Sequence, residues 1–160
     1  MRRIHFDVQR YVERSQGGPC FIGEMLSGRK PHHIIYEDDT HIVFLNKYPT
    51  LYGYAVVAPR DHREHVTTDF SEEEYLSIQR IIYIVSEAIK KTVPTERVYI
   101  LSLGSQQGNS HVHWHIAPLP PGVPYEGQQY AALRAEHGVL DVPHAEMAEL
   151  AARIRGAMNI

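Results

Sequence analysis

The sequence predicts a single compact domain in which short β-strands combine with one long α-helix. The chain has 160 residues, of which 43% are hydrophobic and 22% are charged, so it suits one core rather than two. Several short apolar runs bounded by turn residues are typical of strands, and one longer stretch carries apolar residues at helical spacing. This apolar content excludes disorder over most of the chain.

Five short strands are predicted from residue 34 onward. Each run is rich in β-branched or aromatic residues, and the acidic trio at 37–39 is a turn between the first two runs. The third run opens at Gly53 and closes at Pro59, which cannot donate to a strand ladder. The predicted strands are 34–36, 42–45, 54–58, 98–101 and 111–117.

The long helix is the clearest element. It begins at Ser71, because Ser71 and Glu74 have the spacing of a capping box. Apolar residues follow at intervals of three and four, which is the period of one helix face. Lys90 and Lys91 suit the negative C-terminal end of the helix, and Pro94 stops it soon afterwards.

The two ends of the chain are less regular. Residues 1–18 are predicted to be an N-terminal appendage, in which 7–14 can form one or two helical turns before glycines break the chain. Four prolines from 118 to 124 exclude regular structure directly after the last strand. Residues 119–160 form a C-terminal extension that packs on the same domain. Its two shorter helical patterns lie at about 128–137 and 143–157.

Charge and composition exclude several classes of protein. With 16 Lys and Arg against 19 Asp and Glu, the net charge is −3, so the chain has no basic field for binding a nucleic acid polymer. The longest apolar run, 81–85, is far shorter than the roughly 18 residues of a membrane helix. Cys20 is the only cysteine, so no intrachain disulfide is possible. We therefore expect a cytoplasmic protein with no membrane partner.

A row of histidines is the strongest functional signal. His111, His113 and His115 alternate with apolar residues, so on a strand all three imidazoles point to one face. A polar loop bracketed by Gly104 and Gly108 precedes them. One histidine on a strand is usually an ordinary polar residue, whereas three in register after such a loop predict a functional row.

Two chemistries fit a row of imidazoles. Neutral imidazole is a common metal ligand, and a catalytic zinc site needs three protein ligands. Alternatively, one imidazole attacks a phosphoryl group while its neighbours and loop amides stabilise the developing charge. The first and third histidines would lie roughly 13 Å apart on a strand, which is awkward for one metal. The spacing therefore favours the nucleophile.

Four segments in this order resemble the histidine triad (HIT) superfamily. The resemblance covers about residues 19–118, and it implies an α+β fold with an antiparallel sheet. It also implies a homodimer that hydrolyses or transfers nucleoside monophosphate groups through a nucleotidyl-histidine intermediate. The segments are Ile-Tyr-Glu-Asp-Asp at 35–39, Phe-Leu-Asn-Lys-Tyr-Pro at 44–49, Val-Val-Ala-Pro-Arg-Asp-His at 56–62 and His-Val-His-Trp-His-Ile-Ala at 111–117.

The resemblance assigns a role to each histidine of the row. His113 matches the residue that attacks the α-phosphate, His115 matches the one that contacts a phosphate oxygen or the leaving group, and His111 matches the one that fixes the geometry. Physically, one ring nitrogen of His113 must be free to attack while the other donates to a fixed acceptor. A backbone carbonyl near His111 is the acceptor that we expect.

The resemblance also assigns substrate contacts. Asn46 matches the position that binds the ribose hydroxyls. Four apolar residues match the nucleobase sandwich, with core packing as the alternative interpretation; they are Phe21, Ile22, Met25 and Phe44. Polar residues of the loop before the triad lie where the family contacts phosphate and leaving group; they are Ser102, Ser105, Gln107, Asn109 and Ser110.

The chain also departs from the family pattern. Cys20 stands where many members begin a Cys-x-x-Cys pair, but the second position is Gly23, and the Gly-His of the third strand is Gly53-Tyr54 here. The resemblance implies that the lost groups include zinc ligands. With two of four ligands absent, we expect no structural zinc and no required cofactor. Tyr54 can offer its hydroxyl as a hydrogen-bond partner instead, and His62 is expected at the surface or in a supporting role.

Three functional hypotheses follow. The leading one is an enzyme that cleaves adenosine nucleotides at the α-phosphate, either dinucleoside polyphosphates or nucleoside phosphoramidates, with water or phosphate as acceptor. The second is a nucleotide-binding module with little turnover. The third is a metal-dependent hydrolase that uses the histidine row as ligands; a chelator would silence it but would not affect a histidine nucleophile.

Overall fold

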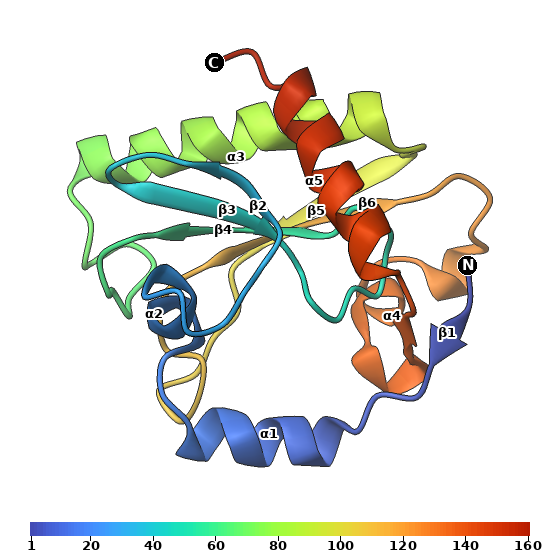
Figure 1. The fold of residues 1–160 in the computed structure, drawn as a ribbon, viewed down its shortest axis with the longest axis horizontal. Coiled ribbons are helices and arrows are strands. Elements are labelled where there is room, and N and C mark those ends of the chain that lie inside the picture. Colours follow the sequence, from blue (N-terminus) through green and yellow to red (C-terminus); the bar gives the residue numbers. More distant parts are fainter.

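The computed structural model describes residues 1–160 as one five-stranded sheet with helices on both faces (Figure 1). The strand order is β2-β3-β4-β6-β5, and every neighbouring pair is antiparallel. The predicted α+β fold with about five antiparallel strands is therefore confirmed. The strands are β2 (Ile34–Glu37), β3 (His41–Leu45), β4 (Ala55–Pro59), β5 (Arg97–Leu101) and β6 (Trp114–Leu119).

One face of the sheet is covered by two helices. The predicted long helix is α3 (Glu72–Thr92), and its capping box is present, since Ser71 Oγ accepts from the Glu74 amide at 3.1 Å and the Glu74 carboxylate accepts from the Ser71 amide at 2.8 Å. Beside it lies α5 (His144–Ala157), as the C-terminal helical pattern predicted (Figure 1). Both helices bury apolar side chains in one core with the sheet.

The opposite face of the sheet carries a second, smaller core. Every residue of β3 and β4 is buried, and alternate residues point to opposite faces. Phe44 and Val56 therefore pack with Ile22 and Met25 of α2 (Phe21–Leu26) rather than with α3. The sequence analysis identified the apolar residues of α2 but not the helix. This helix covers only part of the face.

The two ends of the chain pair with each other. The short strand β1 (Arg3–Ile4) is antiparallel to β7 (Val139–Leu140), and neither strand was predicted. From this ladder the chain leads into α1 (Val8–Gly17), which lies apart from the sheet in Figure 1 and starts at Asp7, whose carboxylate accepts from the Arg10 amide at 3.0 Å. The helical turns predicted at 7–14 are thus part of a longer helix.

One helix predicted in the C-terminal extension was wrong. The pattern at 128–137 is not one helix but α4 (Tyr130–Leu133) between two 3-10 turns (Tyr125–Gly127 and Ala135–His137). Gln129 precedes α4 with a φ of 55°, a left-handed conformation that breaks a continuous helix.

The last strand also differs from its prediction. It begins at Trp114 rather than at residue 111, because the Val112 amide bonds to the Arg63 carbonyl in a loop instead of to a strand. It continues through Pro118, since β4 pairs with β6 only over residues 114–116 and the missing proline N–H falls past that pairing. None of the helices combines the length and apolar character needed to cross a membrane.

Candidate active site

A row of side chains across three strands forms the floor of the candidate site. Phe44 of β3 lies opposite Val56 of β4, and Val56 lies opposite His115 of β6, so all three point to the same face. This is the face that α2 covers only in part. The His113 ring stands next to that of His115, with ring centroids 4.8 Å apart.

His113 has the geometry of a fixed nucleophile. Its Nδ1 lies 2.7 Å from the carbonyl oxygen of His111, as predicted, and a carbonyl can only accept, so Nδ1 carries the proton. Ser102 Oγ donates to the His113 carbonyl at 2.7 Å and holds the backbone from the other side. Burial lowers the pKa of His113 against the opposing effect of the His111 carbonyl. The imidazole is therefore neutral at pH 7, with the Nε2 lone pair free.

His115 is neutral as well. Burial lowers its pKa to about 4, and repulsion from the His113 ring when both rings are protonated acts in the same direction. Its Nδ1 is buried without a hydrogen-bond partner. Tyr54 packs its ring edge-to-face against His115 at 5.7 Å, so the contact between them is aromatic, and no hydrogen bond from the Tyr54 hydroxyl to this ring is formed. Burial raises the pKa of Tyr54 far above its ordinary value, which keeps the phenol protonated.

His111 faces away from the pocket. Its Nε2 donates to the Pro59 carbonyl at 2.8 Å, and its Nδ1 lies 3.3 Å from Cys20 Sγ, so both ring nitrogens are occupied. Burial lowers the pKa of His111 too. Its backbone carbonyl accepts the hydrogen bond from His113 Nδ1 and so fixes the tautomer of that ring.

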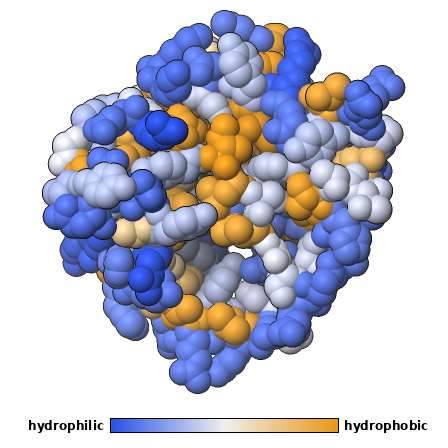
Figure 2. Space-filling view, turned by 180° about the vertical axis from the view of Figure 1, so that it is seen from behind, coloured by the Kyte–Doolittle hydropathy of each residue, from blue (hydrophilic) through white to orange (hydrophobic).

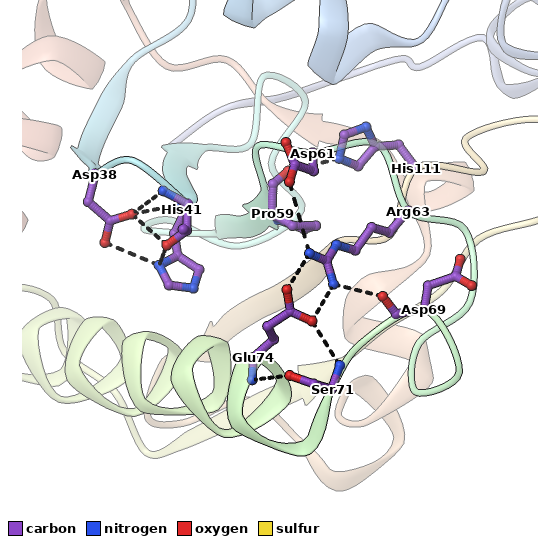
Figure 3. Close-up of polar contacts among 10 residues, drawn as sticks. Asp38, His41, Pro59, Asp61, Arg63, Asp69, Ser71, Glu74 and His111 are labelled. Atoms are coloured by element: carbon purple, nitrogen blue, oxygen red, sulfur yellow. Dashed lines mark hydrogen bonds and ion pairs between the residues drawn. The ribbon is translucent and has the colours of Figure 1, made fainter.

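The segment that carries the first two histidines is tied to the start of α3. The Arg63 carbonyl accepts from the Val112 amide at 2.7 Å. The Arg63 guanidinium bonds both carboxylate oxygens of Glu74, at 2.7 and 2.8 Å, and the carbonyl of Asp69 (Figure 3). Hydrogen bonds from Arg63 and from the Ser71 amide lower the pKa of Glu74 to about 2. The loop is thereby fixed at neutral pH.

A pocket of about 360 Å³ opens over this floor, within the size range of small-molecule sites. In the view from behind, the surface is hollowed above its lower edge (Figure 2), where Figure 1 places α1. Phe21, Phe44 and His32 form an aromatic wall, with centroids 6.3 Å apart for the first pair and 5.4 Å for the second. The predicted residues that line the pocket are Phe21, Phe44, Asn46, Asn109, His113 and His115.

The Asn46 amide is oriented for a ligand. Its Oδ1 accepts from the Tyr48 amide at 2.9 Å, so the Nδ2 group remains available as a donor to a ribose hydroxyl. Asn109 has a φ of 57° and donates from Nδ2 to the Tyr11 hydroxyl at 3.2 Å. Both side chains are thus held by neighbours on the pocket wall.

The structure does not bring every predicted residue to the pocket. Ile22 and Met25 are buried in the smaller core, which is the alternative interpretation given to them. Ser102 uses its hydroxyl on the His113 backbone. Ser105 and Gln107 lie exposed in the loop, where the Ser105 hydroxyl accepts from the Gln107 amide at 3.1 Å.

One side of the pocket was not predicted from the sequence. Residues 1–18 were expected to be an appendage, yet α1 lines the pocket, and so do basic residues near the aromatic wall. The one or two helical turns predicted at 7–14 were the available signal, but nothing in the local sequence places them opposite the triad. The missed residues are Tyr11, Arg14, Ser15, Lys30, His32, Lys47 and Tyr48.

A second cluster of metal-ligating groups lies outside the pocket. Ligand atoms of Cys20, His62 and His111 are within 4.8 Å of one another. Gly23 brings no side chain, and its amide donates to Cys20 Sγ at 3.4 Å. Tyr54 lies against His115 instead, and His62, expected in a surface or supporting role, supplies the third group. These residues do not fit a closed structural zinc site, which needs four protein ligands.

The comparison with known families agrees with this geometry. The HIT domain model matches residues 27–121, more than half of the chain. This chain belongs to the HIT family. Among its relatives is an uncharacterized HIT-like protein of Saccharolobus solfataricus, 30% identical over 102 residues, which span 62% of this chain and 73% of that protein. HIT membership supports a nucleotide-binding or hydrolase module.

Solved HIT structures share the fold. A hypothetical histidine triad nucleotide-binding protein from Sulfolobus tokodaii matches with a TM-score of 0.69 at 21% identity, over 86% of this chain and 91% of that one. A zinc-bound histidine triad family protein from Mycobacterium smegmatis matches with a TM-score of 0.66 at 20% identity, with the same coverage. At these identities the likeness describes the fold alone.

Proposed function

We propose that this protein is an enzyme that cleaves a phosphoanhydride or phosphoramidate bond at the α-phosphate of adenosine nucleotides. The reaction passes through a covalent nucleotidyl-His113 intermediate. The observation that carries the proposal is the 2.7 Å hydrogen bond from His113 Nδ1 to the His111 carbonyl, because it leaves a neutral Nε2 lone pair beside the pocket.

The reaction has two steps. Nε2 of His113 attacks the α-phosphorus, a P–N bond forms, and the bond to the leaving group breaks with its electron pair on the leaving group. An amine leaving group also takes up a proton from solvent and departs as the neutral amine. The Nδ1 proton stays on the ring, where the His111 carbonyl stabilises the positive charge. Water then attacks phosphorus and loses a proton to solvent, the P–N bond breaks, and its electron pair returns to Nε2. His115 stands beside the reacting ring to contact phosphate or leaving group.

The pocket suits an adenosine nucleotide on three counts. Phe21 and His32 offer aromatic surfaces for a base, and both pack against the buried ring of Phe44. The free Nδ2 of Asn46 suits the ribose. No carboxylate lines the pocket, although the whole chain has a net charge of −3, so nothing there repels a phosphate.

The test measures AMP release from diadenosine tetraphosphate and from adenosine phosphoramidate, each with EDTA present. Wild type should cleave at least one substrate under chelation, and His113→Ala should cleave neither. His65→Ala is the matched control, because His65 is exposed outside the pocket, and it should behave as wild type. Repeating the assay with added phosphate separates hydrolysis, which yields AMP, from phosphorolysis, which yields ADP.

The same assay separates the alternatives. Loss of wild-type activity in EDTA would replace this proposal with a metal-dependent hydrolase. Binding of adenosine nucleotides without cleavage of either substrate would identify a nucleotide-binding module. We expect the EDTA-treated protein to be active, because the Cys20 cluster lies outside the pocket and lacks a fourth protein ligand.

We also propose that two copies of the chain associate through β5. This strand is at the edge of the sheet and pairs only with β6, so its outer backbone groups are open to another strand. Ile100 on β5 is 49% exposed and Tyr83 on α3 is 67% exposed, and both line one surface groove. A second copy that covered this groove would bury both side chains.

A further inference from the structure

One helix face outside the HIT match borders the pocket. Tyr11, Arg14 and Ser15 of α1 all line the pocket, and their spacing of three and four residues places them on one side of the helix. The HIT domain model begins only at residue 27. This wall therefore belongs to the chain's own N-terminal segment.

The N-terminal end of α1 is anchored by the opposite end of the chain. The β1–β7 ladder pairs Arg3 with Leu140, and the Arg3 side chain donates to the carbonyls of Gly138 and Thr50 at 3.0 and 2.8 Å. Phe6 packs between Tyr11 and Tyr48, with ring centroids 5.5 and 5.0 Å away. These contacts fix where α1 starts.

The helix α1 packs against the loop before the triad. The Tyr11 hydroxyl accepts from Asn109 Nδ2 at 3.2 Å. Gly108 approaches the backbone of Ser15 so closely that a Cβ there would lie 3.3 Å from the Ser15 carbonyl. The pocket-facing side of α1 is thus held next to the loop that leads into His111 and His113.

The pocket carries surplus positive charge. Three basic side chains line it, those of Arg14, Lys30 and Lys47, and none forms an ion pair. The Lys47 ammonium group lies 5.5 Å from the centroid of the Tyr48 ring. Arg14 makes no side-chain hydrogen bond within the chain, and it alone of the three stands on the α1 wall, across the pocket from the sheet that carries His115.

We infer that Arg14 is a specificity-determining residue that binds the phosphates of the leaving group, beyond the α-phosphate. This inference rests on the proposed function and extends it to a substrate class. A guanidinium pairs with phosphate through two parallel hydrogen bonds, and Arg14 has no competing partner in the chain. The site therefore selects nucleoside polyphosphates, whose leaving group is anionic, over phosphoramidates, whose leaving group is a neutral amine.

The kinetic test compares two substrates and three variants. Arg14→Gln should raise KM for diadenosine tetraphosphate by about tenfold with little change in kcat, because it removes a charge-assisted contact. It should leave both constants for adenosine phosphoramidate unchanged. Arg14→Lys should restore part of the loss. Arg10→Gln, which removes the same charge on α1 from a residue outside the pocket, should have no effect.

Nucleotide binding tests the role of Arg14 without requiring the protein to cleave a substrate. The probes are AMP and adenosine 5′-(α,β-methylene)triphosphate, which cannot be cleaved at the α-phosphate. Arg14→Gln should weaken the triphosphate analogue by about tenfold and AMP by less than about twofold.

The outcomes distinguish the two proposals. If wild type cleaves neither substrate, the proposed function fails, and the binding ratio still decides the role of Arg14. If wild type is active but Arg14→Gln affects both substrates and both probes equally, or none of them, Arg14 does not select the leaving group.

Discussion

The floor and the outer wall of the pocket are built in different ways. The floor lies within the HIT match, and its reacting histidine is fixed by the backbone of a residue two positions away in sequence. The wall comes from α1 and is held by side chains such as Tyr11, which contacts Asn109 at a separation of 98 positions. From this contrast we propose that local backbone geometry sets the chemistry and that long-range side-chain packing sets which substrate fits.

The largest expected effect is a difference between two histidines of the row, His113 and His111. His113→Ala removes the nucleophile and should lower kcat by at least about a thousandfold. His111→Ala should lower the free energy of unfolding by about 1–3 kcal/mol, because the Pro59 carbonyl and the Cys20 thiol lose their partner. Chemical denaturation and steady-state kinetics on both variants check this difference. A folded His113→Ala variant that kept a kcat near that of wild type would contradict the role of His113 as nucleophile.

The next effect concerns the wall. Gly108→Val places side-chain atoms against the Ser15 backbone and should displace α1 from the loop. We expect KM for diadenosine tetraphosphate to rise by about fivefold, with a smaller change for adenosine phosphoramidate. Gly156→Ala in α5, where an added Cβ meets nothing within 4 Å, is the control. An unchanged KM would mean that the wall does not touch the substrate.

A smaller effect is the pH dependence of activity and of stability, which arises from His113 and His115 at the floor of the pocket. Burial lowers the pKa of His113 below the ordinary 6.5, so the acid limb of kcat/KM should have an apparent pKa below 6.5. Stability should follow the same direction. Below pH 6.5 the unfolded chain binds protons that the folded His115, with a pKa of about 4, does not, so stability falls as the pH drops from 6.5 toward 4. His115→Phe should flatten this fall in a series of thermal unfolding curves, and an unchanged slope would assign it to other groups.

The smallest effect on the pocket should come from the sheet edge. Ile100→Lys places a charge on the outer edge of β5 and should halve the particle mass measured by light scattering. Because the groove that contains Ile100 shares no lining residue with the pocket, kcat per subunit should change little. A large loss of kcat on dissociation would show that the partner copy completes the site.

The sequence predicted those parts of the molecule that local rules determine. The capping box at Ser71 and Glu74 fixed the start of α3, and the alternation around His113 identified the triad. The predicted start of the last strand was too early, because the Val112 amide bonds to a loop carbonyl. Alternation of residues along the sequence does not reveal such a tertiary contact. The break at Gln129 depends in the same way on a backbone conformation with no local signature.

The pocket wall could not be predicted for a related physical reason. Nothing in the sequence distinguishes Arg14 and Lys47 from other basic residues. Only the fold places them in one pocket, and no carboxylate lines that pocket. Ser102 was predicted to contact the phosphate or the leaving group because of its place in the sequence. Its hydroxyl instead donates to the His113 carbonyl and holds the backbone there. The sequence located the loop before the triad, but the role of Ser102 depends on a hydrogen bond that only the structure reveals.

The covalent intermediate tests the central claim most directly. Wild-type protein is mixed with diadenosine tetraphosphate, denatured within a single turnover at alkaline pH, where a phosphorus–nitrogen bond to imidazole survives, and mapped by mass spectrometry of its peptides. The account predicts an AMP adduct on His113, present in wild type and absent from His113→Ala. An adduct on another residue, or turnover with no adduct at any time point, would contradict it.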